Sequence, residues 1–341
     1  MKHKGVCYDV GRVMMGRKWR PAFNPEIVRR ELEIIKNDLH CNVVRICGLD
    51  IDRLTVAAEY ALDCGLNVWL SPEMWDRSQQ ETLDYVAKAA ASAEHIGDQA
   101  TNDVVFSVGS ELTLFMEGIV EGNNVFERMV HPSFLDAIRE GTHNAPLNAF
   151  LANANDVVRN AFDGKVTYAS VPFETVDWSQ FDIVCVDLYR DKRIRDGYAN
   201  LLKRWFAFDK PVVIGEVGCC TFRGAEDFGG MGWDIIDATT TPPTLKDDYV
   251  YDQGAQAREL SDLLCVLDDA GVDGAFVFTF VQPLEGFADE VVLKEISFDP
   301  DIAAYGLVKS FIGAQHGTTY PDMPWEPKES FKAVADYYVA H

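Results

Sequence analysis

Short apolar runs rich in β-branched residues alternate with longer amphipathic stretches along almost the whole chain. Each run is nearly continuous in apolar residues, which is typical of a parallel strand buried on both faces. We expect eight such strands, at residues 5–9, 42–48, 67–71, 103–111, 165–171, 182–189, 211–216 and 274–280.

The amphipathic stretches between these runs predict helices. The first begins with Asn24 as its N-cap and Pro25 at its first helical position. Strands that alternate with helices favour a parallel sheet with the helices outside. Eight strands then predict a closed (β/α)8 TIM barrel, an α/β fold that forms a single domain over residues 1–341. The helices are expected at residues 25–39, 51–64, 80–95, 145–162, 195–208, 251–270 and 328–340.

Two connections are much longer than the others. Residues 112–144 follow the fourth strand, and residues 217–250 follow the seventh. Both lie on the strand-to-helix side, which in a TIM barrel is the face that carries the active site. The glycines, aromatics and charges of 118–134 and 221–234 indicate loops that close a pocket.

Charge and composition exclude several partners. Lys and Arg number 31 against 54 Asp and Glu, which gives a net charge of −23 that repels nucleic acid and anionic membrane surfaces. No segment approaches the ~20 apolar residues that span a bilayer, and the first residues lack a signal-peptide pattern, so we expect a cytoplasmic protein. The eight cysteines lack paired CxxC spacings, which argues against a disulfide framework or a zinc site.

The residues that end the strands supply the candidate chemistry. Glu111 and Glu216 each close an apolar strand, where burial raises the pKa of a carboxyl and a nearby cation lowers it. The seven histidines all lie outside the strand ends, so a histidine-based metal site or triad has few candidates. No glycine-rich nucleotide motif occurs, and we expect neither a metal nor a cofactor.

Four strand motifs resemble one family. VVFSVGSE at 104–111 and VVIGEVG at 212–218 are similar to the fourth and seventh strands of clan A retaining glycoside hydrolases, which are (β/α)8 barrels. VVRICG at 43–48 and VCVDLYR at 184–190 resemble the second and sixth strands of that clan. The chain also resembles bacterial proteins labelled abortive phage infection proteins.

The glycosidase resemblance implies a role for four residues. Glu111 would be the general acid/base and Glu216 the nucleophile. Arg45 would lie beneath Glu216 and keep it ionised, and Tyr189 would hydrogen-bond to it. This division agrees with the retaining mechanism, which needs one ionised and one protonated carboxyl group.

Two positions depart from the family pattern. Ser110 stands where the clan usually has an asparagine that binds the sugar 2-hydroxyl, and Phe280 is nearest to the usual strand-eight tryptophan. The remaining side chains expected to bind substrate are Asp9, Glu73, Trp75, Ser110, Trp178, Asp187, Trp233 and Phe280. For the three tryptophans, core packing is an equally good interpretation.

The sequence thus predicts a retaining glycoside hydrolase that is exo-acting on a small β-linked saccharide or glycoside. Transglycosylation through the same intermediate stays open. A divalent-metal isomerase or hydrolase would instead use Glu73, Glu111, Asp187 and Glu216 as oxygen ligands. A third alternative is a barrel that binds sugar in phage defence without cleaving it.

Overall fold

The computed structural model describes residues 1–341, and its centre is a closed barrel of eight parallel strands. This confirms the predicted (β/α)8 fold. Around the barrel the strands follow the order β1-β12-β9-β8-β7-β6-β5-β4, so each neighbours the next strand of the barrel along the chain. Their bounds are β1 His3–Gly11, β4 Val43–Gly48, β5 Asn67–Pro72, β6 Val104–Ser110, β7 Lys165–Ser170, β8 Val184–Asp187, β9 Val212–Val217 and β12 Gly274–Val277.

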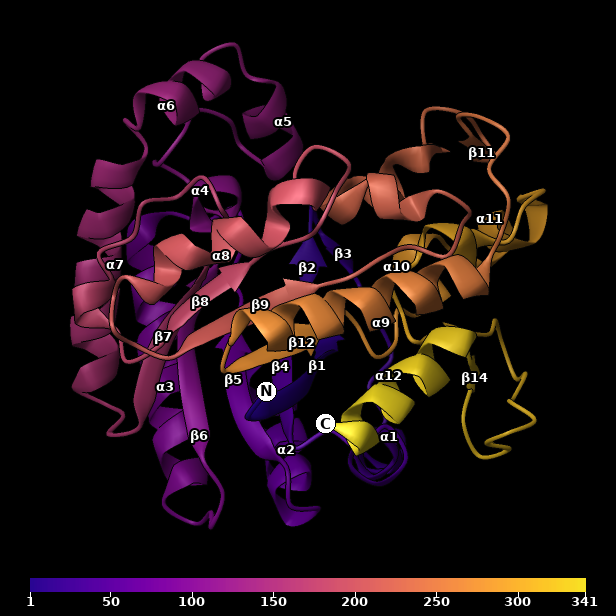
Figure 1. The fold of residues 1–341 in the computed structure, drawn as a ribbon, viewed down its shortest axis with the longest axis horizontal. Helices are drawn as coiled ribbons and strands as arrows, with labels where there is room; N and C mark the ends of the chain where they lie inside the picture. The colour runs from indigo at the N-terminus through magenta and orange to yellow at the C-terminus, as the bar shows by residue number, and fades with distance from the viewer.

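Seven longer helices pack outside this barrel, near the predicted positions (Figure 1). Asn24 caps the first by accepting a hydrogen bond from Glu26 N, and Ser78 and Glu81 form a reciprocal capping box at the third. Only the one-turn η1 Trp178–Gln180 lies between β7 and β8. The helices are α1 Pro25–Asn37, α2 Ile51–Asp63, α3 Gln79–Gly97, α7 Asn144–Arg159, α8 Tyr198–Phe206, α9 Gln253–Ala270 and α12 Glu329–Ala340.

Short elements decorate the connections, and both long insertions lie on the upper side of the barrel in Figure 1. The insertion after β6 holds α4 Leu112–Phe115, α5 Val125–Val130 and α6 Phe134–Glu140. The insertion after β9 holds η3 Ala225–Asp227, η4 Gly229–Ile235, β10 Ile236–Asp237 and β11 Thr244–Leu245. The others are β2 Val13–Met14, β3 Arg17–Lys18, η2 Arg195–Gly197, α10 Leu284–Phe287, α11 Glu290–Glu295, η5 Pro300–Ala303, β13 Val308–Ser310 and β14 Trp325–Pro327.

The barrel interior is a packed core and not a pore. Trp69 of β5 and Phe276 of β12 meet inside it with ring centroids 4.9 Å apart. A Cβ at Gly5 would come within 2.4 Å of the Phe276 ring, so only glycine fits beside it on β1. The filled interior fixes the spacing of the strands and hence the positions of the side chains at their ends.

A buried carboxylate ties the start of the barrel to the end of the chain. Glu31 of α1 accepts hydrogen bonds from Tyr8 of β1, from Arg20 Nη2 at 2.6 Å and from Trp325 Nε1 at 2.8 Å. Its side chain is buried, as is that of Arg20. A buried ion pair of this kind is expensive to break because the remaining charge has no partner.

We therefore expect Glu31→Gln to lower the free energy of unfolding by about 3 kcal/mol, because it leaves the Arg20 guanidinium buried without its counter-ion. Urea unfolding followed by circular dichroism would measure this. Glu33→Gln is the matched control, since Glu33 lies on the same helix in an exposed pair with Arg30 and its loss should cost less than about 0.5 kcal/mol. Equal losses in the two variants would contradict the role of Glu31.

Candidate active site

Arg45 forms the floor of the site at the strand ends. Its side chain projects from β4 and is completely buried. Its Nη1 donates to Asp187 Oδ1 at 3.1 Å, to the Gly215 carbonyl at 3.0 Å and to Glu216 Oε1 at 3.4 Å. A Cβ at Gly215 would lie 2.4 Å from Asp187 Oδ1, so glycine is required for this close packing. One arginine thus connects β4 with β8 and β9.

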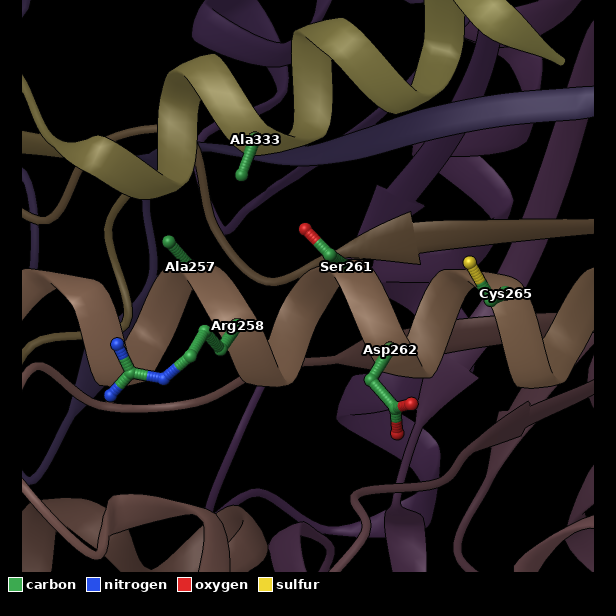
Figure 2. A pocket seen from close by; sticks show the side chains of 6 residues that line it. All are labelled: Ala257, Arg258, Ser261, Asp262, Cys265 and Ala333. Carbon is green, nitrogen blue, oxygen red and sulfur yellow. The ribbon is translucent and has the colours of Figure 1, made fainter.

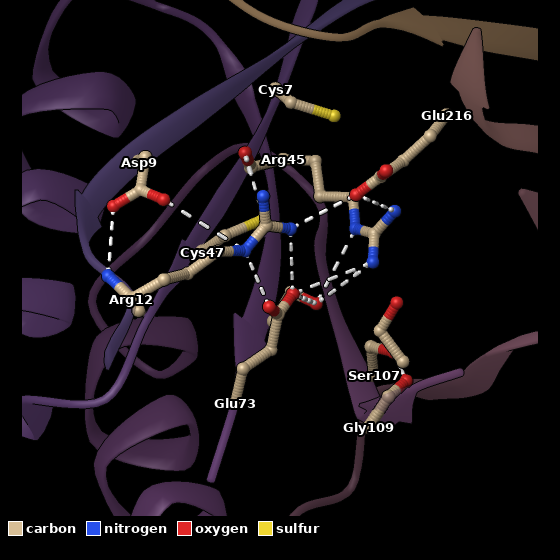
Figure 3. Close-up of polar contacts among 12 residues, drawn as sticks. Cys7, Asp9, Arg12, Arg45, Cys47, Glu73, Ser107, Gly109 and Glu216 are labelled. Carbon is tan, nitrogen blue, oxygen red and sulfur yellow. Dashed lines mark hydrogen bonds and ion pairs between the residues drawn. The ribbon is translucent and has the colours of Figure 1, made fainter. Parts of the chain in front are cut away.

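Glu216, near the end of β9, is surrounded by donors. Oε1 accepts from Arg12 Nη2 at 2.9 Å as well as from Arg45, and Oε2 accepts from the Tyr189 hydroxyl at 2.8 Å. Figure 3 shows the Glu216 carboxylate facing both guanidinium groups. The predicted contacts of Glu216 with Arg45 and Tyr189 are therefore present, and the second guanidinium was not predicted.

Arg12 is the functional candidate that sequence reasoning missed. The first strand was expected to end at residue 9, but β1 continues to Gly11 and carries Arg12 to the same edge as the other strand ends. Arg12 forms a bidentate pair with Glu73 through Nε and Nη2, with Nη2–Oε1 at 2.9 Å (Figure 3). The signal in the sequence was an arginine directly after an apolar strand and its glycine.

Asp9 and Glu73 hold the site arginines in position. Asp9 Oδ1 accepts from the backbone N–H of Gly11 at 2.6 Å and of Arg12 at 2.9 Å, which fixes the turn that presents Arg12. Glu73 is held between Arg12 and Arg45, whose Nη2 lies 3.6 Å from Oε1. Both carboxylates were expected to bind substrate. Both oxygens of Glu73 accept from protein donors, whereas Asp9 Oδ2 is buried without a hydrogen-bond partner.

Asp187 and Ser110 form a buried pair beside Arg45. The Ser110 hydroxyl donates to Asp187 Oδ2 at 2.9 Å. Burial raises the pKa of Asp187 to about 7, against the lowering effect of Arg45, and the nearby charge of Glu216 adds to the rise. Both side chains thus lie where they were predicted, but the serine hydroxyl is committed to Asp187.

Glu111 follows the end of β6 and differs from Glu216 in its surroundings. Its backbone is left-handed, with φ at 50°, an uncommon conformation for a residue other than glycine. Its side chain is half-buried and forms no hydrogen bond or ion pair with the protein. Burial, followed by the charges of Asp187, Glu216 and Glu174, raises the pKa of Glu111 well above its usual value. This carboxyl group is therefore suited to hold a proton.

Aromatic rings enclose the Arg12 guanidinium. Its central carbon lies 5.3 Å from the Phe278 ring centroid, 5.7 Å from that of Trp19 and 5.9 Å from that of Trp75. Trp75, at the mouth as predicted, also stacks on Phe115 of α4 with centroids 4.2 Å apart. Trp19 and Phe278 were not predicted as site residues.

The prediction that Trp178 and Phe280 bind substrate is wrong. Trp178 is 2% exposed and packs on Phe181, and its carbonyl accepts from Lys210 just before β9, at the opposite end of the barrel. Phe280 is fully buried against Tyr8 and Trp325 outside the barrel. The regular strand ends at Val277, so residue spacing beyond it no longer fixes the face.

The two insertions meet above the strand ends. Trp233, on η4, is 37% exposed, and its ring contacts that of Phe126 on α5 edge to face with centroids 5.8 Å apart. Trp233 therefore lies on the rim of the site, where it was expected. The contact brings the segment after β6 against the segment after β9, which narrows the approach to the strand ends.

A surface groove lies away from these residues, on the outer surface of the barrel. It is an open groove between α9 and α12, with Arg258, Asp262 and Cys265 on α9 and Ala333 on α12 (Figure 2). The structure contains no cluster of three or more His, Cys, Asp or Glu side chains arranged to hold a metal ion, and no helix long and apolar enough to cross a membrane.

Known structures share the fold over the whole chain. A GH113 β-1,4-mannanase superposes with a TM-score of 0.62 at 15% identity and covers 100% of both chains. The GH113 β-mannanase of Alicyclobacillus acidocaldarius, solved in complex with ManMIm, gives 0.62 at 16% identity over 99% of this chain and 97% of its own. No family model and no curated protein matches the sequence.

β-Glucuronidases also contain this barrel as part of a longer chain. β-Glucuronidase 2 of Bacteroides uniformis matches 99% of this chain but only 35% of its own, with a TM-score of 0.57 at 15% identity. The enzyme from Ruminococcus gnavus gives 0.58 at 13% identity over 99% and 50% of the two chains. At these identities the similarity establishes the fold.

The raised pKa of Asp187 predicts a specific pH dependence of stability. A carboxyl group whose pKa rises on folding, here from 3.8 to about 7, contributes stability that is complete below pH 4 and is lost as the pH rises through 7. Asp187→Asn mimics the protonated form. Its free energy of unfolding relative to wild type should therefore increase by about 2 kcal/mol between pH 5.5 and 8.

Urea unfolding at the two pH values measures this difference. Asp196→Asn, at an exposed carboxylate, is the control and should shift the free energy of unfolding equally at both pH values. A constant difference between wild type and Asp187→Asn would show that Asp187 does not titrate in this range.

Proposed function

We propose that this protein is a retaining glycoside hydrolase that cleaves β-linked saccharides or glycosides without a cofactor. The observation that carries the proposal is the contrast between two carboxyl groups, one after β6 and one on β9, at the same end of the barrel. Glu216 is held by two guanidinium groups and a tyrosine, whereas Glu111 has no protein partner and a raised pKa. A retaining glycosidase needs one ionised nucleophile and one protonated acid.

The proposed reaction has two steps. Glu216 attacks C1 of the sugar while Glu111 gives its proton to the departing glycosidic oxygen, which leaves a glycosyl ester on Glu216. Glu111 then takes a proton from water, the water oxygen bonds to C1, and the ester bond to Glu216 breaks. Arg12, Arg45 and Tyr189 hold the Glu216 carboxylate before attack and stabilise it again when it is released.

Two further observations support the substrate class. The neighbours in structure are mannanases and glucuronidases, all named for β-glycosidic substrates or linkages. The Phe126–Trp233 contact between the insertions favours an enclosed site, and we propose exo-action on a short substrate for that reason. Release of single sugars from a reducing-end-labelled oligosaccharide, rather than internal cleavage, would support this mode.

The alternatives differ in what the same residues would do. Transglycosylation needs only that an acceptor hydroxyl replace water in the second step. A divalent-metal enzyme would use oxygens of Glu73, Glu111, Asp187 and Glu216 as ligands. Three of these carboxylates, Glu73, Asp187 and Glu216, here accept hydrogen bonds from Arg12 and Arg45. A sugar-binding barrel in phage defence would keep the site but would not break the glycosidic bond.

Chemical rescue tests the nucleophile. In Glu216→Gly we expect turnover of 4-nitrophenyl β-glycosides to fall by on the order of 10⁴-fold or more, because no carboxylate remains to attack C1. Azide should restore turnover and yield the α-glycosyl azide, identified by NMR. Glu111→Gly is the matched control, because azide there should give the β-glycosyl azide through the intact nucleophile. Full activity of Glu216→Gly without azide would contradict the assignment.

A leaving-group series tests the acid. In Glu111→Gln we expect kcat/KM to fall by about 10²–10⁴-fold for methyl β-glycosides and much less for 2,4-dinitrophenyl β-glycosides, which need no proton to leave. The raised pKa of Glu111 predicts that the wild-type kcat/KM falls with rising pH as Glu111 loses its proton, at a pH well above that at which an ordinary glutamic acid ionises. This alkaline limb should disappear in Glu111→Gln. Equal losses for both leaving groups would argue against Glu111 as the acid.

A further inference from the structure

Arg12 has one nitrogen that no protein group uses. Its Nε and Nη2 bind Glu73 and Glu216, but no protein acceptor lies within hydrogen-bond distance of Nη1. Nη1 is not one of the buried polar atoms that lack a hydrogen-bond partner, so it keeps some contact with solvent. A guanidinium of this kind presents one free N–H group in a fixed direction beside the Glu216 carboxylate.

The position of this nitrogen is set from several sides. Both oxygens of Glu73 accept from the guanidinium, and Glu216 accepts from Nη2. The rings of Trp19, Trp75 and Phe278 enclose the guanidinium. Asp9 fixes the backbone of Arg12 itself. The free N–H of Nη1 is therefore preorganised and needs little ordering when a ligand binds.

The other donors next to Glu216 are already committed. Arg45 is fully buried, and its nitrogens face Ser71, Asp187, the Gly215 carbonyl and Glu216 itself. The Tyr189 hydroxyl donates to Glu216 Oε2, and the Ser110 hydroxyl donates to Asp187. Among the side chains that contact Glu216, Arg12 is thus left as the one with a free donor.

Glycoside chemistry indicates what this donor would meet. When Glu216 attacks C1, the hydroxyl group on the adjacent C2 lies next to the attacking carboxylate, and hydrogen bonds to this hydroxyl strengthen in the transition state. The positive charge of Arg12 is balanced by Glu73, and the carboxylates of Glu73 and Glu216 surround it. A donor here can therefore bind O2 without opposing the positive charge that develops on the sugar ring.

We propose that Arg12 is the substrate-binding residue that donates from Nη1 to the sugar 2-hydroxyl, so that the enzyme selects glycosides with an oxygen at C2. This inference rests on the proposed glycosidase function. It assigns the recognition of C2 to the segment after β1, with Ser110 left as a partner of Asp187.

The proposal can be tested by measuring parent and 2-deoxy substrates with the wild-type enzyme and with variants. The parent substrates are 4-nitrophenyl β-glucoside and β-mannoside, and their common deoxy form is the 4-nitrophenyl 2-deoxy-β-arabino-hexopyranoside. For each enzyme, kcat/KM for the better parent is divided by that for the deoxy compound. The different intrinsic reactivity of the deoxy compound cancels when these ratios are compared between enzymes.

Arg12→Lys keeps the charge beside Glu73 and Glu216, but its three N–H donors are on one nitrogen, which cannot occupy the positions of both Nη2 and Nη1. We expect its ratio to fall at least ~10-fold below that of wild type, the loss of one hydrogen bond to a charged donor. Ser110→Ala is the matched control and should keep the wild-type ratio within about 3-fold. A collapse of the ratio in Ser110→Ala, or an unchanged ratio in Arg12→Lys, would overturn the assignment.

A crystal structure gives an independent measurement that does not need an Arg12 variant. In Glu111→Gln soaked with the parent glycoside, we expect Arg12 Nη1 within 2.7–3.2 Å of O2; a separation beyond about 4 Å would overturn the proposal.

If azide rescues Glu216→Gly but the ratios do not change, only the role of Arg12 fails. If wild type cleaves no glycoside and azide rescues nothing, the proposed function fails as well.

Discussion

The roles of the carboxylates in the candidate site depend on which of them are paired with an arginine. Arg12 and Arg45 are the guanidinium groups that pair with Glu73, Asp187 and Glu216. Buried charges are tolerated only when they are paired and hydrogen-bonded, so each of these three carboxylates has a fixed position. Glu111 forms no ion pair with either arginine, and its raised pKa follows from burial and from the nearby charges of Asp187, Glu216 and Glu174. Glu216 is paired with arginines and Glu111 is not, and this difference gives two chemically identical side chains different roles.

The barrel makes this arrangement possible because it brings distant segments to one rim. Arg45 lies on β4, Asp187 on β8 and Glu216 on β9, and all three meet within hydrogen-bond distance. The pairing of β8 with β9 is irregular at Asp187 and Glu216, and that of β6 with β7 is irregular between Ser107 and Ser110. Local irregularities of this kind re-aim side chains at strand ends. A rigid, filled interior below them keeps the distances constant.

Much of the fold could be predicted because its signals are local. Continuous apolar runs indicated the eight strands, and caps such as Asn24 and Ser78 mark helix starts. Glu111, Glu216, Arg45 and Tyr189 could be selected because they end or belong to those runs and resemble known strand motifs. Arg12 was missed because β1 runs two residues further than its apolar run, and a strand boundary is poorly defined by composition alone.

The sequence by itself determined the order of strands and helices, the long insertions and the presence of carboxylates at strand ends, since these follow from periodicity and spacing. Tertiary structure alone decided which donors face which oxygens. Phe278 and Phe280 are two residues apart, yet the first faces Arg12 and the second packs under Trp325, because the regular strand has already ended. Likewise, Ser110 is committed to Asp187 and Arg12 keeps a free nitrogen only through contacts between strands. Such pairings depend on contacts between residues that are far apart in the sequence, which no local pattern encodes.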